Sequence, residues 1–365
     1  MKRLLPVWVG APRLDSVLLM LLLLIVCFGL LVLYSASGQD LAVVERQVVR
    51  LGFGLVVMLV ISQVPPRVLR MWTPWLYGIG IVMLLATLVV GVGRGTQRWL
   101  DFGMFRFQPS ELMKLAVPMM VAWYLHPRVL PPNWKHVAVS VGILLVPTLL
   151  IYRQPDLGTS LLVAASGGFT LYLAGLRWRI LLGFIVLATA AAPVLWFVLK
   201  EYQRNRVRTF LDPEADPLGH GWNIIQSKIA VGSGGLTGKG WLNGTQSNLE
   251  FIPERHTDFI LAVLSEEFGL LGVSLLLLAY TLLIARGLHI ASIARDTGSR
   301  LLAGSLSLTL FVYVMVNGGM VSGVLPVVGV PLPLISYGGT SAVTLLAGFG
   351  IMMSIYGHRK FIRLR

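Results

Sequence analysis

Apolar residues along the chain gather into long runs that short polar segments separate. About ten of these runs reach the roughly 20 mostly apolar residues that a helix needs to cross a bilayer. The predicted spans are residues 16–34, 47–63, 74–92, 108–126, 136–152, 158–175, 180–199, 259–285, 301–323 and 338–356. The second is the weakest because it carries Arg50, and the fifth and sixth are joined so closely that they must form a tight hairpin. The pattern predicts an all-α, polytopic integral membrane protein.

Composition supports this class of protein. Of the 365 residues, 56% are hydrophobic and 13% are charged, whereas a soluble globular chain carries about 25% charged residues. The single cysteine, Cys27, lies in the first apolar run, which excludes an intrachain disulfide and a thiol–metal cluster. That run follows a short basic stretch and lacks a small-residue cleavage site. We therefore predict a retained helix and not a cleaved signal peptide.

The net charge of +14 indicates how the chain lies in the membrane. With the N-terminus inside, more than half of the Lys and Arg residues fall in inner segments, whose acids are Asp15 and Asp296. Both termini are then cytoplasmic. The excess charge indicates topology and contact with anionic membrane lipid, and it does not suggest nucleic-acid binding. We see no internal repeat, which counts against a repeat-built transporter.

The outer side carries the longer connections. They are residues 93–107, a large loop at about 200–258 between the seventh and eighth spans, and the Gly/Pro-rich stretch 324–337. No soluble domain is attached, so residues 1–365 are expected to form a single transmembrane domain. Any chemistry is expected at the outer face.

Arginines are unusually frequent in the first outer connection, where Arg94, Arg98 and Arg106 alternate with aromatic residues. The aromatic residues are ordinary interfacial anchors. Three arginines on this side suit a diphosphate or another multiply charged anion, because a guanidinium binds phosphate oxygens bidentately.

The following span opens with a second polar group. Pro109 is expected as the first helical residue, with Ser110 and Glu111 in the first turn. Lys114 follows Glu111 by three residues, so the two side chains share a helix face and can pair. The pair is either a structural ion pair or a device in which Glu111 holds Lys114 towards a ligand.

The stretch "GSGGLTGKG" (232–240) does not fit a nucleotide-binding phosphate loop, because Ser233 and Gly240 stand at positions where that motif needs Gly and Ser or Thr. It is either a flexible hinge after a short interfacial helix, or a set of exposed N–H groups that bind an anionic headgroup with Lys228 and Lys239.

Other polar candidates are weaker. Arg153 and Asp156 lie in the tight hairpin, where Asp156 is expected to cap a helix. In the large outer loop, arginines alternate with neutral residues and could add to an anion-binding rim; they are Arg204, Arg206 and Arg208. The six histidines show no ligand spacing, so no metal site is predicted.

The mouth of the eighth span holds the densest charge, in "FIPERHTDFILAVLSEEFG" (251–269). Charges at this depth are costly and favour a functional site. Thr257 is expected as the N-cap and Asp258 in the first turn, where the helix dipole favours an ionised carboxylate. Asp258 is then either a cap residue or a base that accepts a proton from a hydroxyl group. At least one of Glu266 and Glu267 is expected to pack against another helix.

Five stretches together resemble the SEDS (shape, elongation, division and sporulation) family, and they cover essentially the whole chain. They are "RWLDFGMFRFQPSELMKL", "QPDLGTS", "GSGGLTGKG", "FIPERHTDFILAVLSEEFGLLG" and "PLPLISYGGTS". The stretch "VSGVLPVVGVPLPLISYGG" resembles the elongation-type members, whereas the division paralogue has a charged Thr-Lys-Gly variant between the two prolines.

The resemblance implies a function. Such proteins polymerise lipid II into glycan strands at the outer face of the bacterial cytoplasmic (inner) membrane, for cell elongation and rod shape. They work with a class B penicillin-binding protein of the elongation type and with other elongation-complex proteins. Asp258 matches the family's essential acidic residue, and Glu111 and Lys114 match its buried pair. Asp258 is then expected to take the proton from the acceptor GlcNAc 4-hydroxyl, which displaces undecaprenyl diphosphate from the donor.

Residues expected to bind substrate are the polar side chains of the outer segments and of the adjoining helix starts. They are Arg94, Arg98, Gln108, Ser110, Glu111, Lys114, Arg153, Lys239, Glu254, His256 and Thr257. No cofactor is required, although a divalent cation (Mg or Mn) could accompany the lipid diphosphate. The alternative functions are a lipid II flippase, whose headgroup path the intramembrane charges would line, and a non-catalytic activator of the penicillin-binding protein.

Overall fold

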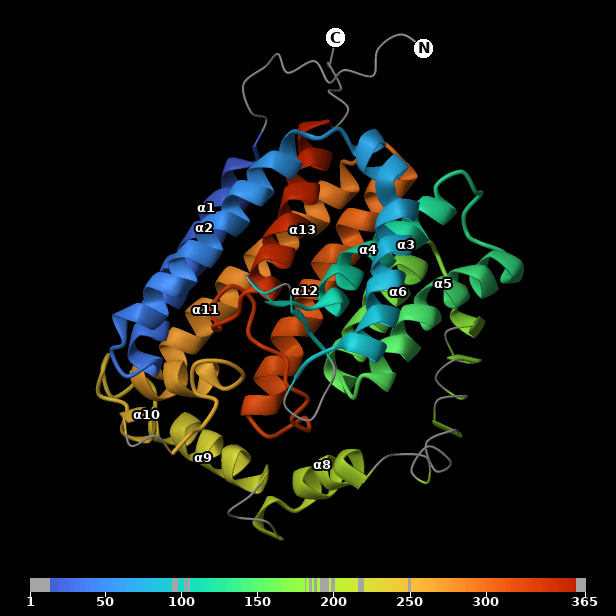
Figure 1. The fold of residues 1–365 in the computed structure, drawn as a ribbon. Helices are drawn as coiled ribbons and strands as arrows, with labels where there is room; N and C mark the ends of the chain where they lie inside the picture. Colours follow the sequence, from blue (N-terminus) through green and yellow to red (C-terminus); the bar gives the residue numbers. More distant parts are fainter. Residues whose placement is uncertain are drawn as a thin grey trace.

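The computed structural model shows a bundle of long helices (Figure 1). It describes residues 14–358 except 94–97, 102, 104–105, 181, 184–185, 187–188, 191–196, 198–200, 216–219 and 249–250. The helices that form the bundle are α1 (Ser16–Ala36), α2 (Leu41–Gln63), α3 (Pro66–Val90), α4 (Pro109–Leu125), α5 (Trp134–Arg153), α6 (Leu157–Leu173), α11 (Ile260–Ser292), α12 (Thr297–Val321) and α13 (Thr340–Gly357).

Shorter elements connect these helices on one side. They are β1 (Leu100–Asp101) and β2 (Arg106–Phe107), then α8 (Glu201–Leu211), the 3-10 turn η1 (Pro213–Ala215), α9 (His220–Ser233) and α10 (Thr245–Asn248). The two strands pair antiparallel, with Leu100 opposite Phe107. In Figure 1, α8, α9 and α10 lie at the end of the bundle opposite to the end where α1 begins and α13 ends.

The predicted all-α membrane fold is confirmed. Every predicted span except 180–199 coincides with a helix, and most residues of that span lie outside the described residues. Among the described residues, six helices are individually long and apolar enough to cross a bilayer; they are α1, α3, α5, α11, α12 and α13. The chain is therefore a multi-pass membrane protein.

The predicted inner segments meet at one end of the bundle. Arg286 Nη2 lies 2.7 Å from Asp15 Oδ2, and Arg70 Nη1 lies 3.3 Å from Asp296 Oδ1. His126 is part of the second cluster, 3.4 Å from the same oxygen of Asp296. These contacts join segments that the charge distribution placed on the same side.

The helix α11 is broken near its start, where Gly269 has φ +63° and ψ −162°. A side chain at this position would overlap the backbone of the 235–240 loop. The loop fills the break: Lys239 N donates to the carbonyl of Glu266 (3.0 Å), and Gly240 N donates to that of Glu267 (3.0 Å). The predicted flexible hinge is therefore wrong, because the "GSGGLTGKG" loop is fixed by hydrogen bonds to the broken helix.

Candidate active site

Asp258 lies in a turn that precedes α11, and not in the helix. Residues 253–259 form turns, and α11 begins at Ile260 with Phe259 at the N-cap and no side-chain cap. The predicted N-cap role of Thr257 is wrong; its hydroxyl instead donates to Glu254 Oε2 (2.6 Å). The side chain of Asp258 is therefore not occupied in capping the helix.

The environment of Asp258 raises its pKa to about 6, chiefly because the carboxyl group is buried and also because Glu254 is close. The charge of Arg206 on α8 opposes this rise, and Asp156 adds to it. The expectation that a helix dipole would favour ionisation is therefore wrong. A pKa near 6 leaves the group mostly ionised at pH 7, as a general base needs.

A polar cavity of about 190 Å³ lies next to Asp258. Asp258 is not itself a lining residue, but an added Cβ at Gly329 of the cavity wall would lie 3.4 Å from Asp258 Oδ2, so the carboxylate lies against that wall. The lining also includes four of the predicted substrate residues, from the segment before α4 and from α4 itself; they are Arg98, Gln108, Glu111 and Lys114. The fold thus brings these four together with Asp258.

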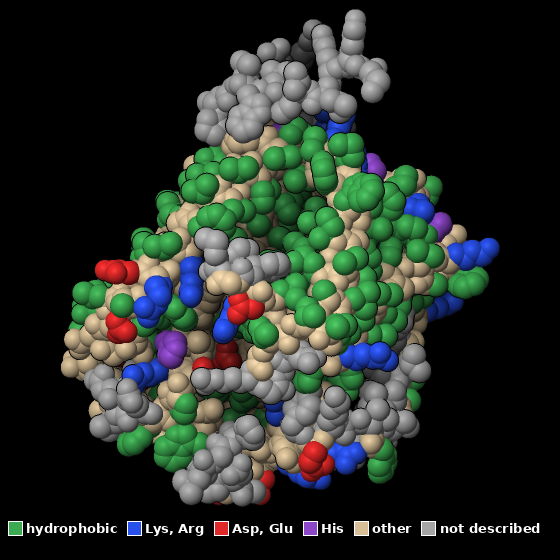
Figure 2. Space-filling view, viewed as in Figure 1, with side chains coloured by type: hydrophobic (Ala, Val, Ile, Leu, Met, Phe, Trp, Pro, Cys, Tyr) green, Lys and Arg blue, Asp and Glu red, His purple; other side chains and the backbone are tan. Residues whose placement is uncertain are grey.

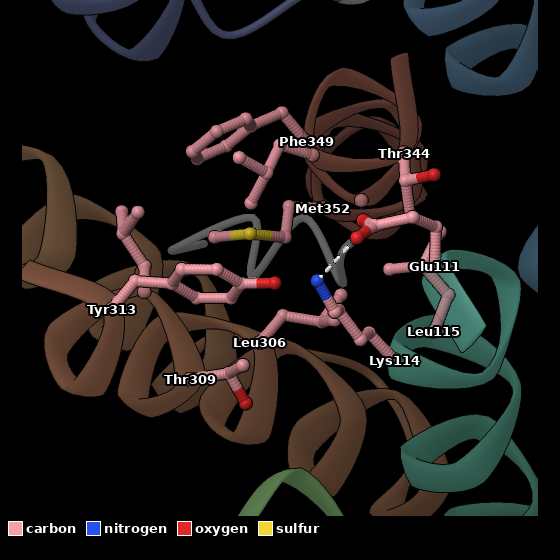
Figure 3. Close-up of a pocket in the computed structure, with 12 residues that line it drawn as sticks. Glu111, Lys114, Leu115, Leu306, Thr309, Tyr313, Thr344, Phe349 and Met352 are labelled. Carbon is pink, nitrogen blue, oxygen red and sulfur yellow. Dashed lines mark hydrogen bonds and ion pairs between the residues drawn. The ribbon is translucent and has the colours of Figure 1, made fainter. Parts of the chain in front are cut away.

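The predicted pair at the start of α4 is present and buried. Lys114 Nζ lies 2.6 Å from Glu111 Oε1, and each residue is 5% exposed. Figure 3 shows Lys114 between Glu111 and Tyr313, whose ring centre is 5.1 Å from Nζ. Apolar side chains such as Phe349 and Met352 surround this group on one side. The pair therefore forms the floor of the polar cavity at the point where it meets the apolar bundle.

Arg98 and Asp156 also line the polar cavity. Gln108 Nε2 donates to Asp156 Oδ2 (3.1 Å), and Arg98 Nη1 lies 3.9 Å from the same oxygen. Asp156 also caps α6 by accepting from Thr159 N (3.2 Å), as predicted. Arg98 donates further to the carbonyls of Gln154 (3.2 Å) and Pro155. Part of its hydrogen-bonding capacity therefore holds the hairpin between α5 and α6.

A wider groove of about 1020 Å³ opens beside the polar cavity, and both are lined by Trp99 and by residues 338–340. Its other walls include Val49 and Phe53 of α2, which are 71% and 62% exposed. Figure 2 shows the face hollowed at its centre, with hydrophobic side chains around the hollow and charged side chains at its lower rim. A largely apolar groove, with Arg50, Asp101 and Arg106 also on its walls, thus lies between the surface of α2 and the polar cavity.

The remaining predicted residues are scattered around this site or lie away from it. Arg153 is exposed at the end of α5, and Arg94 lies outside the described residues. Lys239 Nζ pairs with Glu266 Oε1 (2.7 Å), a carboxylate that also accepts from Thr245 N (2.9 Å). Neither Arg153 nor Lys239 lines the polar cavity.

Ser110 and His256, two further residues predicted to bind substrate, are surrounded by other parts of the protein. Ser110 is 1% exposed, and its hydroxyl has no hydrogen-bond partner among the described residues. The His256 ring packs edge-on against Tyr337, with ring centres 6.0 Å apart. Glu267 accepts a hydrogen bond from Ser35 of α1, which confirms that one of the two adjacent glutamates packs against another helix.

Sequence patterns did not identify three residues near the cavity. Arg50 lines the groove, with its guanidinium carbon 4.6 Å from the centre of the Tyr337 ring. Tyr313 covers Lys114, and Asn317 bonds to the backbone of Asp258. The charge of Arg50 within an apolar span was the one available signal, because Tyr313 and Asn317 stand in an ordinary helical pattern.

Comparison with known proteins places the chain among bacterial cell-wall proteins. The profile of the cell cycle protein family FtsW/RodA/SpoVE matches residues 15–361. The peptidoglycan glycosyltransferase MrdB of Escherichia coli is 57% identical over 96% of this chain and 95% of that protein. The probable peptidoglycan glycosyltransferase FtsW of Geobacter metallireducens is 35% identical over 94% of each chain.

Solved structures agree with this placement. One is a chain of a peptidoglycan synthase complex that structurally coordinates polymerization and crosslinking, with a TM-score of 0.83 and 36% identity over 94% of this chain and 97% of that chain. Another is the rod shape determining protein RodA of Thermus thermophilus, with a TM-score of 0.73 and 31% identity over 97% and 99% of the two chains.

Proposed function

The chain belongs to the FtsW/RodA/SpoVE family of cell cycle proteins, which is the SEDS family predicted from its sequence. From this membership and the geometry of the polar cavity, we propose how the protein joins sugars. The chain is a peptidoglycan glycosyltransferase of the SEDS type. We propose that it polymerises lipid II at the outer face of the bacterial inner membrane. The observation that carries the proposal is that a largely apolar groove meets a polar cavity, with the Asp258 carboxylate against the cavity wall at Gly329.

The two compartments suit the two halves of a lipid-linked sugar. The groove, lined by Val49, Phe53 and Phe107, matches a polyprenyl chain entering from the bilayer. The polar cavity matches the diphosphate and the first sugar, because its donors include Arg98 and Lys114. The substrate is then anchored by its lipid while its anomeric carbon lies near Asp258.

Asp258 is proposed as the general base. Its carboxylate takes the proton from the 4-hydroxyl of the acceptor GlcNAc while that oxygen attacks the anomeric carbon of the donor MurNAc. The bond from that carbon to the diphosphate oxygen breaks, and the configuration at the carbon inverts. The raised pKa of Asp258 makes the carboxylate a stronger base than an exposed aspartate.

The leaving group is a diphosphate, and its developing charge needs cations. Lys114 has donors beyond its bond to Glu111, and Arg98 lines the same cavity, so these two are proposed to bind it. Arg50 lies on the groove wall and is a further candidate. Within the described ranges, no three or more His, Cys, Asp or Glu side chains are placed so that they could hold a metal ion, so a Mg or Mn ion would be bound partly by the diphosphate.

The direct test uses the purified chain with lipid II in detergent. A polymerase makes glycan strands under these conditions, whereas a flippase needs a sealed membrane and an activator needs its partner enzyme. Absence of polymer from folded protein, with a cation and with the partner added in turn, would contradict the proposal.

The polymerisation rate is expected to fall as pH drops through about 6, because protonated Asp258 cannot accept a proton. Glu254→Gln removes a charge that raises the pKa of Asp258. The acid limb, which is the low-pH side of the plot of kcat against pH, should therefore move to lower pH. Arg206→Gln removes a charge that lowers this pKa, so the limb should move to higher pH. The measurement is kcat against pH for the three proteins.

A matched control for this prediction is Arg208→Gln on the same helix. Arg208 pairs with Glu201 at 3.0 Å, and both side chains are well exposed. The variant makes the same charge change as Arg206→Gln and should leave the acid limb in place. Equal shifts in Arg206→Gln and Arg208→Gln would show that the pH of the acid limb depends on the net charge of the protein and not on the local field at Asp258.

We further propose that the partner is a class B penicillin-binding protein of the elongation type, which would crosslink the new strands. The support is the likeness to a chain from a complex that coordinates polymerization and crosslinking. Such a protein should co-purify with this chain from native membranes, and its reproducible absence would count against the proposal.

A further inference from the structure

The side chain of Asn317 joins two segments that border the polar cavity. It lies on α12, is 0% exposed, and its Nδ2 group donates to the backbone carbonyls of Asp258 (2.9 Å) and Val330 (2.8 Å). Val330 lines the cavity next to Gly329, the residue beside the Asp258 carboxylate. One amide therefore fixes both segments between which the carboxylate lies.

The geometry of this amide is not explained by helix packing alone. Both of its N–H groups are used, while its Oδ1 atom is buried with no partner among the described residues. An unpaired buried acceptor is unfavourable, and an apolar residue would avoid it. An apolar residue would, however, take this donor from the buried carbonyl of Val330 and the partly buried carbonyl of Asp258, and the turn at Asp258 would lose this link to α12.

We propose that Asn317 is a positioning residue, which holds the backbone at Asp258 and Val330 so that the Asp258 carboxylate stays against the cavity wall at Gly329. The inference rests on the proposed role of Asp258 as the base. Neighbouring residues of the turn have other ties: Ser336 Oγ donates to Thr257 O (2.6 Å), and Tyr337 N donates to His256 O (2.8 Å). Loss of the Asn317 amide should therefore loosen Asp258 locally without detaching the turn.

The test is steady-state lipid II polymerisation by Asn317→Ala, with the amount and melting temperature of each protein measured. We expect kcat to fall by about 10–100-fold, because displacement of a catalytic group by about an ångström can cost that much. The KM for lipid II should change by no more than about twofold, since the lipid and diphosphate contacts remain.

The pH profile is the readout that a purely structural role would not move. Burial and Glu254 raise the pKa of Asp258, Asp156 adds to the rise, and Arg206 opposes it. A loosened turn lets water reach the carboxylate, which weakens the effect of burial. The acid limb of kcat should then move to lower pH in Asn317→Ala. A fall in kcat with an unmoved limb would overturn the proposal.

Two variants and one control make the result decisive. Asn317→Ser keeps one short donor and should lie between wild type and Asn317→Ala; it replaces the alanine variant if that protein does not fold. Ser322→Ala removes a hydroxyl whose bonds to Gly318 O (2.8 Å) and Gly319 O (3.3 Å) stay within the end of α12, and it should behave as wild type. A serine variant with wild-type kcat and acid limb would overturn the proposal.

Asp258→Asn, measured in parallel, separates this inference from the proposed function. If the wild type makes no polymer, or Asp258→Asn is as active as wild type, the proposed function is wrong. If Asp258→Asn is inactive and Asn317→Ala matches the wild type, only the positioning role is wrong.

Discussion

Asp258→Asn is expected to lower the rate of lipid II polymerisation by about 10²–10⁴-fold while the protein remains folded, because that is the usual contribution of a general base. Asparagine has nearly the same size as aspartate but cannot accept the proton. The substitution also leaves the backbone carbonyl that Asn317 binds. The rate of glycan synthesis at matched protein amount and melting temperature measures the effect.

The structure makes this experiment easier to interpret. A cap residue would lose stability as well as activity on substitution, and the two roles would be confused. α11 has no side-chain cap, so the Asp258 carboxylate contributes no hydrogen bond to the start of that helix. Asp212→Asn, at an exposed position after α8, is a matched control that should retain full activity. Synthesis by Asp258→Asn at the wild-type rate would remove Asp258 as the base.

Asp258→Glu refines the same prediction. The carboxylate is kept but moves outward by one methylene group, on the order of an ångström, and such an error can cost about 100-fold in rate. The carboxylate also lies against Gly329 of the cavity wall, so a longer side chain would press on that wall. We expect an activity slightly above that of Asp258→Asn and far below that of the wild type.

The helical bundle was predictable because each span is a local signal. A run of apolar residues needs no partner to be recognised. The exact helix starts were less predictable: Asp15 and Asp296 cap α1 and α12, and α12 begins at Thr297, ahead of the predicted start at 301. The pair of Glu111 and Lys114 was predictable for the same reason, since three residues along one helix fix the geometry.

The turn at Asp258 was not predictable, because residues distant in the chain hold it. Ser336 and Asn317, which follow by more than 50 residues, bond to the carbonyls of Thr257 and Asp258. Local preference alone favoured a helix start with Thr257 as its cap. Tertiary hydrogen bonds instead hold residues 253–259 as turns, so the helix begins later.

The placement of Lys239 was missed for a related reason. A Gly-rich loop with a lysine suggests an anion site, and the sequence gives no sign that α11 breaks at Gly269. The break exposes helix carbonyls, and the loop supplies the N–H groups that satisfy them. Lys239 then pairs with Glu266, which is 0% exposed, and this pairing gives the lysine a structural contact outside the cavity.

Lys114→Met is expected to reduce both stability and polymerisation strongly. Glu111 is 5% exposed and loses the ammonium group 2.6 Å away, which leaves a buried carboxylate without its charge partner. Removing one member of a buried ion pair typically costs about 3–5 kcal/mol. The measurements are the melting temperature in detergent and the rate of glycan synthesis at matched amounts of folded protein.

The double variant Glu111→Gln with Lys114→Met separates the two effects. It removes both charges at similar volume, so much of the lost stability should return. Activity should not return, because Lys114 lines the cavity proposed to bind the diphosphate, and methionine cannot offset the charge of the leaving group. A stable double variant with restored synthesis would show that the pair is purely structural. Full activity of Lys114→Met at normal abundance would show that neither role matters, and Arg98, the other cation that lines the cavity, would then be the candidate to bind the diphosphate.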